Sequence, residues 1–163
     1  MGLTLGSEEL LKAGEPAPDF KLMDQDSTWH SLSDYKGQRV VVYFYPKNDT
    51  PGCTKEACSI RDDYSLFEKD SIKVFGISYD TAKSHKKFAE KYALPFTLLS
   101  DAEKTTAKAY GADGFFVPKR KTFLIDEQGN LIKIYSDVDV TSHGAQILAD
   151  FMAVPVPKAK SGK

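Results

Sequence analysis

Two cysteines are the residues of this sequence best placed for covalent chemistry. Cys53 and Cys58 are the only cysteines among 163 residues, and both lie where an apolar run is followed by the start of a predicted helix. The N-terminus of a helix presents N–H groups without intrahelical partners and the positive end of the helix dipole. A thiolate is stabilised there, so we expect Cys53 to be more ionised near neutral pH than a free cysteine and to be the better nucleophile.

The apolar side of the predicted helix defines the surroundings of this thiol. Cys53 precedes Ala57 by four residues and Ile60 by seven, a spacing that puts the three side chains on one face. We expect that face to lie against a sheet and to hold the sulfur in a dry pocket. Such shielding favours small peroxides over bulky electrophiles.

The spacing of the two cysteines has a mechanical consequence. In an intact helix, residues five apart have Cα atoms about 8.6 Å from each other. A disulfide needs Cα atoms closer than about 7 Å. If Cys53 and Cys58 pair during turnover, the first turns of the helix must unwind.

Other interpretations of the cysteines compete with a reactive thiol. Cysteines are most often buried packing residues, but a position directly behind Thr50, Pro51 and Gly52 at a helix start favours a functional thiol. A C-x4-C spacing differs from the C-x-x-C of general disulfide exchangers, so a dithiol oxidoreductase acting on proteins is the weaker enzyme hypothesis. A non-enzymatic binding module with silent cysteines is the third hypothesis.

A metal site has little support from the sequence. Thiolates and imidazoles bind zinc, but there is no second cysteine pair and the three histidines are scattered. These are His30, His85 and His143. We therefore expect no metal here, and we interpret His143 as a helix-start residue without a catalytic role.

Alternating strand-like and helix-like segments must position the cysteines. The strongest strand is Val40 to Tyr45, whose consecutive β-branched and aromatic residues suit a central strand covered on both faces. An amphipathic helix follows from the cysteine segment to about Lys69, with apolar residues at steps of three and four. The further predicted elements are strands at 72–79, 96–99, 122–126 and 131–135, and helices at 84–92, 102–110 and around 147–151.

The order of these elements predicts the fold class. Strand–helix–strand units require parallel neighbours joined by right-handed crossovers. The connection from Glu127 to Asn130 has hairpin length, so the last two strands are expected to be antiparallel. The sequence thus predicts an α/β protein with a mixed central sheet flanked by helices. This arrangement is thioredoxin-like, although periodicity alone does not separate it from other small α/β sandwiches.

Length and charge limit the organisation and the partners. A chain of 163 residues with 41% hydrophobic residues predicts one domain, which we place at residues 1–154, followed by a mobile basic tail at 155–163. A formal charge of −1 gives no field that attracts nucleic acid or anionic lipid.

The longest apolar run is too short to cross a bilayer. Without a recognisable leader, we expect a cytoplasmic protein, or one of an organelle stroma if a transit peptide was removed.

The segment from Thr50 to Cys58 resembles the peroxiredoxins. The family signature P-x-x-x-T-x-x-C corresponds to Pro46, Thr50 and Cys53, and the pattern T-P-G-C-T-x-E-A-C of the peroxiredoxin Q or bacterioferritin comigratory protein branch is matched without a gap. Similarity extends over nearly the whole chain, from residues 14–20 to 122–126. The resemblance implies a thioredoxin-like fold and reduction of hydrogen peroxide and alkyl hydroperoxides. It also implies that no cofactor is needed, that thioredoxin or glutaredoxin is the reductant, and that the protein is a monomer or a weak homodimer.

The resemblance also implies residue roles. Cys53 is expected to be the peroxidatic cysteine that becomes a sulfenic acid, and Cys58 the resolving cysteine that condenses with it. Thr50 is expected to hydrogen-bond the peroxide, and Pro46 to shield the sulfur from water. Arg120 matches the family arginine that favours the thiolate and stabilises charge along the breaking O–O bond.

Three further residues receive weaker interpretations. Glu56 matches the family acid that positions the arginine, but by itself it also fits a partner of the helix dipole or a solvated charge. Phe115 and Phe116 lie in a loop that is shorter than in many bacterial members. We expect them in the core or in a pocket wall, where they could contact an organic hydroperoxide.

Overall fold

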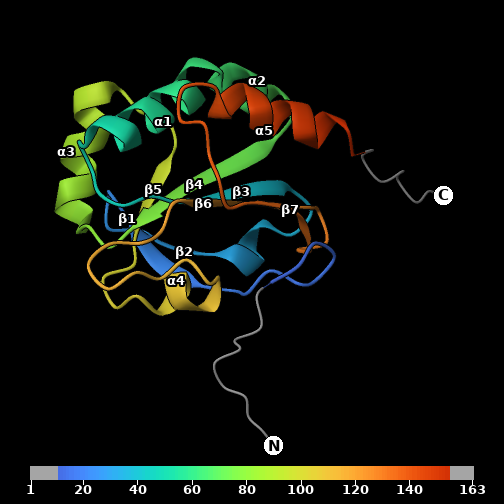
Figure 1. Cartoon of the computed structure of the whole chain (residues 1–163), viewed down its shortest axis with the longest axis horizontal. Helices are drawn as coiled ribbons and strands as arrows, with labels where there is room; N and C mark the ends of the chain where they lie inside the picture. The colour runs from blue at the N-terminus through green and yellow to red at the C-terminus, as the bar shows by residue number, and fades with distance from the viewer. Residues whose placement is uncertain (1–10, 155–163) are drawn as a thin grey trace, which may run out of the picture.

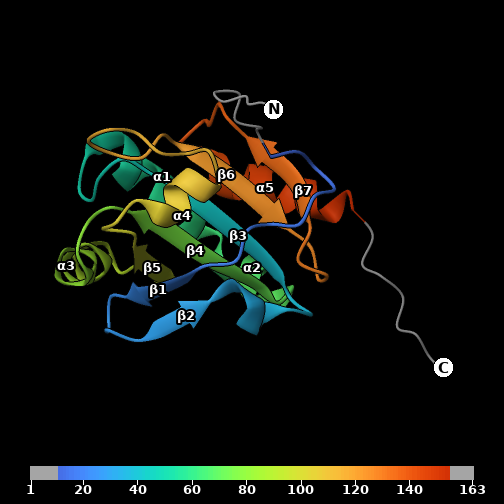
Figure 2. The same ribbon diagram turned by 90° about the horizontal axis from the view of Figure 1, so that it is seen from below.

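A computed structural model describes residues 11–154 of the chain, and within these residues a seven-stranded sheet carries helices on both faces (Figure 1). The tail predicted at residues 155–163 lies outside the described residues. The strand order is β2-β1-β5-β4-β3-β6-β7, which Figure 2 shows along the sheet. The strands are β1 (Lys21–Asp24), β2 (Trp29–Ser31), β3 (Arg39–Phe44), β4 (Ile72–Ser78), β5 (Thr97–Ser100), β6 (Lys121–Ile125) and β7 (Leu131–Tyr135).

The central strands explain the mixed character of the sheet. β3 pairs parallel with β4, and β4 pairs parallel with β5. β3 also pairs antiparallel with β6, which forms an antiparallel hairpin with β7. The predicted combination of parallel crossover units with a late hairpin is therefore confirmed.

Helices cover the two faces of the sheet unequally. In Figure 1, α1 (Pro51–Asp62), α2 (Tyr64–Lys69) and α5 (His143–Met152) lie on one side of the sheet, and the short α4 (Thr105–Ala109) lies on the other. The helix α3 (Ala82–Tyr92) contributes Phe88 and Ala89 to the same core as α1 and α5. A 3-10 turn, η1 (Leu32–Tyr35), follows β2.

β3 separates two hydrophobic cores. Val41 and Tyr43 point to the core beneath α1, α2, α3 and α5, whereas Val40, Val42 and Phe44 point to the core on the α4 side. All six residues of β3 are buried. The prediction of a central strand covered on both faces is thus confirmed, and the end of this strand is held rigidly where the cysteine segment begins.

The structure corrects the prediction of one continuous helix to about Lys69. The helix is interrupted at Asp63, whose N–H donates to the Ile60 carbonyl and whose own carbonyl accepts from Leu66 and Phe67. One residue thereby ends α1 and begins α2. Aspartate suits this junction because it is a poor residue for a helix interior.

Two elements at the start of the described chain have no counterpart in the predicted ones. β1 and β2 have only four and three residues and mix polar with apolar side chains. The helix predicted at 102–110 is shorter than expected, because the Asp101 carboxylate accepts from the N–H groups of Thr106 and Ala107 at its start. Among the described residues, the helices are too short or too polar to cross a membrane.

Candidate active site

The cysteine segment forms the first turns of α1, just beyond the carboxyl end of β3. Thr50 is the N-cap in an extended conformation, Pro51 occupies the first helical position, and the N–H of Thr54 donates to the Thr50 carbonyl at 2.8 Å. Proline fits this position because its missing N–H would have no intrahelical partner. The N–H groups of Gly52 and Cys53 precede the first intrahelical bond, so they are oriented to bind negative charge in front of the helix.

Cys53 lies inside the molecule on the sheet-facing side of α1. Its residue is 1% exposed and packs in the core that includes Tyr43, Ala57 and Ile60. Cys58 is half-buried on the same helix, and both cysteines are free. The structure therefore places the first cysteine in the dry surroundings that the apolar spacing predicts, and it shows the helix between the two cysteines intact.

Arg120 connects the sulfur to a buried carboxylate. One guanidinium nitrogen, Nη2, lies 3.4 Å from the Cys53 Sγ, and the other, Nη1, lies 2.6 Å from the Glu56 Oε1. A Cβ at position 52 would come within 3.1 Å of Nη2, so glycine at Gly52 allows this close approach. Burial lowers the pKa of Arg120, but the charges of Glu56 and Cys53 outweigh this and raise it, so the guanidinium stays charged.

Glu56 is fully buried and pairs with Arg120 through one oxygen only. Its side chain is 0% exposed, and its second oxygen, Oε2, has no hydrogen-bond partner. Burial raises the pKa of Glu56 to about 7, even though the arginine acts in the opposite direction. The interpretation of Glu56 as a solvated charge is therefore wrong, and its side chain contacts Arg120 instead.

Thr50 and Pro46 lie in the segment that leads from β3 into α1. The Thr50 hydroxyl donates to the Lys47 carbonyl at 2.8 Å, which leaves the lone pairs of Oγ1 as acceptors for an incoming O–H group. Pro46 is half-buried at the end of β3. The structure thus joins Cys53, Arg120 and Glu56 by direct contacts, with Thr50 three residues away in the same helical turn.

A buried hydrogen-bond network that the sequence analysis missed fixes the loop between β3 and α1. The Asn48 side chain accepts from the Tyr45 hydroxyl at 2.6 Å and donates to His85 Nδ1 at 2.9 Å and to the Ser84 Oγ at 3.0 Å. His85 in turn donates from Nε2 to the Leu99 carbonyl at 2.9 Å. Burial lowers the pKa of His85, which keeps the neutral ring that this arrangement needs. No local sequence signal marks an asparagine whose amide group donates to residues 36 and 37 positions later.

The prediction that Phe115 and Phe116 lie in the hydrophobic core is wrong. Their residues are 80% and 82% exposed, and the two rings contact each other edge to face. The loop is held by its backbone instead, because the Tyr79 hydroxyl donates to the Gly114 carbonyl and the Lys104 ammonium donates to the Phe115 carbonyl. His143, by contrast, is the first residue of α5, as predicted.

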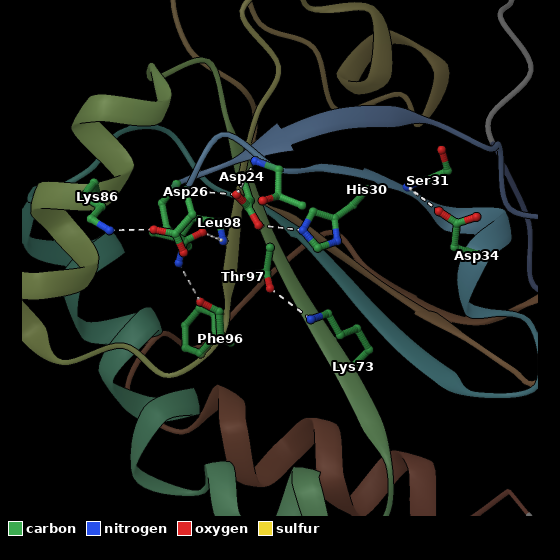
Figure 3. Close-up of polar contacts among 12 residues, drawn as sticks. Asp24, Asp26, His30, Ser31, Asp34, Lys73, Lys86, Phe96, Thr97 and Leu98 are labelled. Carbon is green, nitrogen blue, oxygen red and sulfur yellow. Dashed lines mark hydrogen bonds and ion pairs between the residues drawn. The ribbon is translucent and has the colours of Figure 1, made fainter.

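A second cluster of charged side chains lies at the other end of the strand order and is drawn in Figure 3. His30 lies between two partners, with Nε2 2.6 Å from the Asp24 Oδ2 and Nδ1 2.8 Å from the Tyr35 hydroxyl. Burial alone would raise the pKa of Asp24, but hydrogen bonds from the Thr28 N–H and from His30 hold it below its ordinary value. These bonds close the β1–β2 hairpin, and we assign the cluster a structural role.

The hypothesis of a metal site can be compared with the arrangement of the candidate ligand side chains. Within residues 11–154, no group of three or more histidine, cysteine, aspartate or glutamate side chains is arranged so that it could hold a metal ion.

The fold and the thiol site have counterparts among known proteins. A family model described as "AhpC/TSA family" matches residues 13–134. The chain therefore belongs to the AhpC/TSA family, and within it to the peroxiredoxins, which are peroxidases of thioredoxin-like fold.

Individual relatives define the branch. A putative peroxiredoxin bcp of Coxiella burnetii is 44% identical over 146 residues, which cover 85% of this chain and 97% of that protein. The chloroplastic peroxiredoxin Q of Oryza sativa subsp. japonica is 51% identical over 127 residues, which cover 76% of this chain and 58% of the rice protein. The chain thus spans little more than half the length of the plant relatives.

Solved structures agree with the sequence matches. The peroxidoxin BcpB of Mycobacterium tuberculosis has a TM-score of 0.84 at 36% identity, covering 89% of this chain and 99% of that one. A cysteine-to-serine mutant of Xylella fastidiosa PrxQ has a TM-score of 0.84 at 30% identity, covering 89% and 98%. A bacterioferritin comigratory protein of Xanthomonas campestris, studied for its alkyl peroxide reduction activity, has a TM-score of 0.81 at 29% identity, covering 87% and 98%.

Proposed function

We propose that this peroxiredoxin reduces hydrogen peroxide and alkyl hydroperoxides with Cys53 as the peroxidatic cysteine and Cys58 as the resolving cysteine. The observation that supports the proposal most strongly is the position of the Cys53 Sγ, which lies 3.4 Å from the Arg120 guanidinium in the first turn of α1. This arrangement combines a nucleophile with two sources of positive potential. Alkyl hydroperoxides are included because of the activity of the Xanthomonas relative.

The first step is a nucleophilic displacement on oxygen. The Cys53 thiolate attacks one oxygen of ROOH, an S–O bond forms, the O–O bond breaks, and the departing RO⁻ takes up a proton as ROH. The Thr50 Oγ1 accepts from the hydroxyl of the peroxide, which orients it, while Arg120 and the free N–H groups of the first turn stabilise the charge that spreads over both oxygens. Pro46 limits the access of water.

The second step forms the disulfide. The Cys58 sulfur attacks the sulfenic sulfur of Cys53, and the hydroxyl group leaves as water. Because the cysteines are five residues apart in α1, the helix between them opens in this step. Thioredoxin, or a glutaredoxin, then reduces the disulfide, which places the enzyme in a compartment that keeps thiols reduced, the cytoplasm or an organelle stroma.

The test is peroxide consumption with a thioredoxin recycling system, measured for the wild type and both cysteine variants. We expect Cys53→Ser to lose turnover, and Cys58→Ser to reduce one equivalent of peroxide and then to stop at the sulfenic acid. Normal turnover of Cys58→Ser would exclude resolution by this residue. Rapid reduction of insulin without reactivity toward peroxide would identify a dithiol exchanger instead.

A further inference from the structure

The unpartnered oxygen of Glu56 faces a buried histidine. Glu56 Oε2 lies 3.8 Å from His143 Nε2, and both side chains are 0% exposed. Leaving a buried polar atom without a partner is unfavourable, and it is more unfavourable for a charged group than for a neutral one. An ionised Glu56 with one orphaned oxygen is therefore poorly stabilised at this place.

The hydrogen bonds of His143 determine what the ring offers to Glu56. Nδ1 lies 3.3 Å from the Gln146 Oε1, which accepts, so this nitrogen carries the hydrogen. Nε2 lies 2.8 Å from the Thr122 Oγ1 and is the acceptor. Burial lowers the pKa of His143 to about 4, so the ring is neutral. The lone pair of Nε2 is thus used by the Thr122 hydroxyl, so the neutral ring gives an ionised Glu56 Oε2 neither a hydrogen bond nor a positive charge.

The charges around Glu56 lead to the same conclusion. The groups that face it are Cys53 in α1, Arg120 before β6, His143 in α5, and Tyr43 and Tyr45 in β3, which burial keeps neutral by raising each pKa well above its ordinary value. Asp139 and Asp150 act on His143 from the α5 side. Arg120 is thus the cation in contact with Glu56, and it is shared with the Cys53 sulfur. With a thiolate and an ionised Glu56, this buried group would carry one excess negative charge.

We propose that Glu56 is a proton store, which holds a proton while Cys53 is a thiolate and releases it when Cys53 is oxidised. This inference rests on the proposed oxidation of Cys53 by peroxide. The step balances as Cys–S⁻ + ROOH + Glu–COOH → Cys–SOH + ROH + Glu–COO⁻, so the proton that the departing alkoxide takes up is balanced by the one that Glu56 releases. The thiolate, the guanidinium and the carboxyl group sum to zero charge before the step, and the sulfenic acid, the guanidinium and the carboxylate sum to zero after it. When the reductant returns Cys53 as a thiol, its proton returns to Glu56.

Infrared difference spectroscopy tests the store directly. The Cys58→Ser variant stops at the sulfenic acid, and its spectra are compared slightly below neutral pH before and after one equivalent of hydrogen peroxide. We expect the carbonyl band of a protonated carboxylic acid to disappear on oxidation, and this loss to be missing when Glu56→Gln is added. Glu127→Gln is the matched control, because Glu127 is paired with Arg39 far from the thiol and also has a buried oxygen without a partner. This control should keep the loss, and a band that persists in oxidised Cys58→Ser would overturn the proposal.

Proton uptake gives an independent measurement. Oxidation of a thiolate consumes one proton, which an indicator dye in weak buffer detects as uptake from solvent. We expect Cys58→Ser to take up much less than one proton per thiol, and the double variant with Glu56→Gln to take up about one. Equal uptake in both would contradict a store at Glu56. Mass spectrometry distinguishes the absence of a proton store from a failure of the proposed function. A Cys53 that gains no oxygen has not reacted with peroxide at all, whereas an oxidised Cys53 with equal proton uptake in both variants excludes only the store.

Discussion

At the scale of single residues, the proposed chemistry depends on one guanidinium shared by two acidic groups. Arg120 contacts the Cys53 sulfur with one nitrogen and the Glu56 carboxyl group with the other. Its planar fork allows both contacts at once, which a lysine ammonium cannot reproduce in the same geometry. Removing the guanidinium leaves the sulfur with the helix N-terminus as its source of positive potential.

Replacement of Arg120 should therefore slow the oxidation of Cys53. We expect Arg120→Ala to reduce the rate of the first step by about 100-fold, a typical effect of losing one charge-stabilising donor. Arg120→Lys should restore part of this loss. The rate is measured by competition for stoichiometric hydrogen peroxide, with Lys119→Ala as the control for loss of a neighbouring exposed charge. A normal rate in Arg120→Ala would show that the contact has no role in the reaction.

The raised pKa of Glu56 predicts how stability depends on pH. A carboxyl group with a raised pKa in the folded state binds its proton more tightly there, so its contribution is fully present below the unfolded value near 4.5 and is lost as pH rises through about 7. Glutamine stays neutral at every pH. In urea unfolding of reduced protein, Glu56→Gln should match the wild type at about pH 4 and exceed it by up to about 3 kcal/mol above pH 8, from 1.36 kcal/mol per pKa unit. The exposed Glu68→Gln is the control, and a constant difference at all pH values would contradict the assignment.

At the scale of elements, the proposed mechanism requires that α1 be stable enough to position the thiol and unstable enough to open. Its first turn contains glycine and proline, and its buried residues are Cys53, Glu56, Ala57 and Ile60. Glu56 lies between the two cysteines, so opening of the helix also disturbs the ion pair with Arg120. The loop before α1 is fixed separately to α3 through Asn48 and His85. The unwinding should thus be confined to the helix and should spare the loop.

Hydrogen exchange can locate this opening. We expect amides in residues 53–60 to exchange at least 10-fold faster in the disulfide form than in the reduced form, because pairing of Cys53 with Cys58 breaks intrahelical bonds. Amides of α3 should change little and serve as the internal control. Equal protection of residues 53–60 in both redox forms would rule out the coupling of the disulfide to local unwinding.

At the scale of the whole molecule, local patterns in the sequence predicted the α/β class, the parallel and antiparallel parts of the sheet and the buried face of Cys53. They did not predict β1 and β2, because strands of three or four residues with mixed polarity carry little periodic signal. They also did not bring His143 to Glu56, since that contact depends on how α5 packs against α1. Exposure of Phe115 was missed because aromatic residues in loops are usually assigned to a core.

The packing of α5 on α1 gives a prediction for the whole fold. Gly144 donates its N–H to the Ser59 Oγ at 2.8 Å, and a Cβ at this position would lie 2.5 Å from the Ser59 carbonyl oxygen. Backbone atoms cannot yield as a flexible side chain can, so Gly144→Ala must push α5 away from α1, and His143 with it. We expect a loss of about 1–3 kcal/mol in the free energy of unfolding, despite the better helix propensity of alanine, together with a slower oxidation of Cys53.

The exposed neighbour Ala145 supplies the matched control for this substitution. Ala145→Gly should lose about 1 kcal/mol through helix propensity alone and leave the rate with hydrogen peroxide unchanged. Because both variants exchange glycine and alanine in the same turn, only the contact between the two helices distinguishes them. If Gly144→Ala proved as stable and as fast as the wild type, the close packing of α5 on α1 would have no bearing on the thiol.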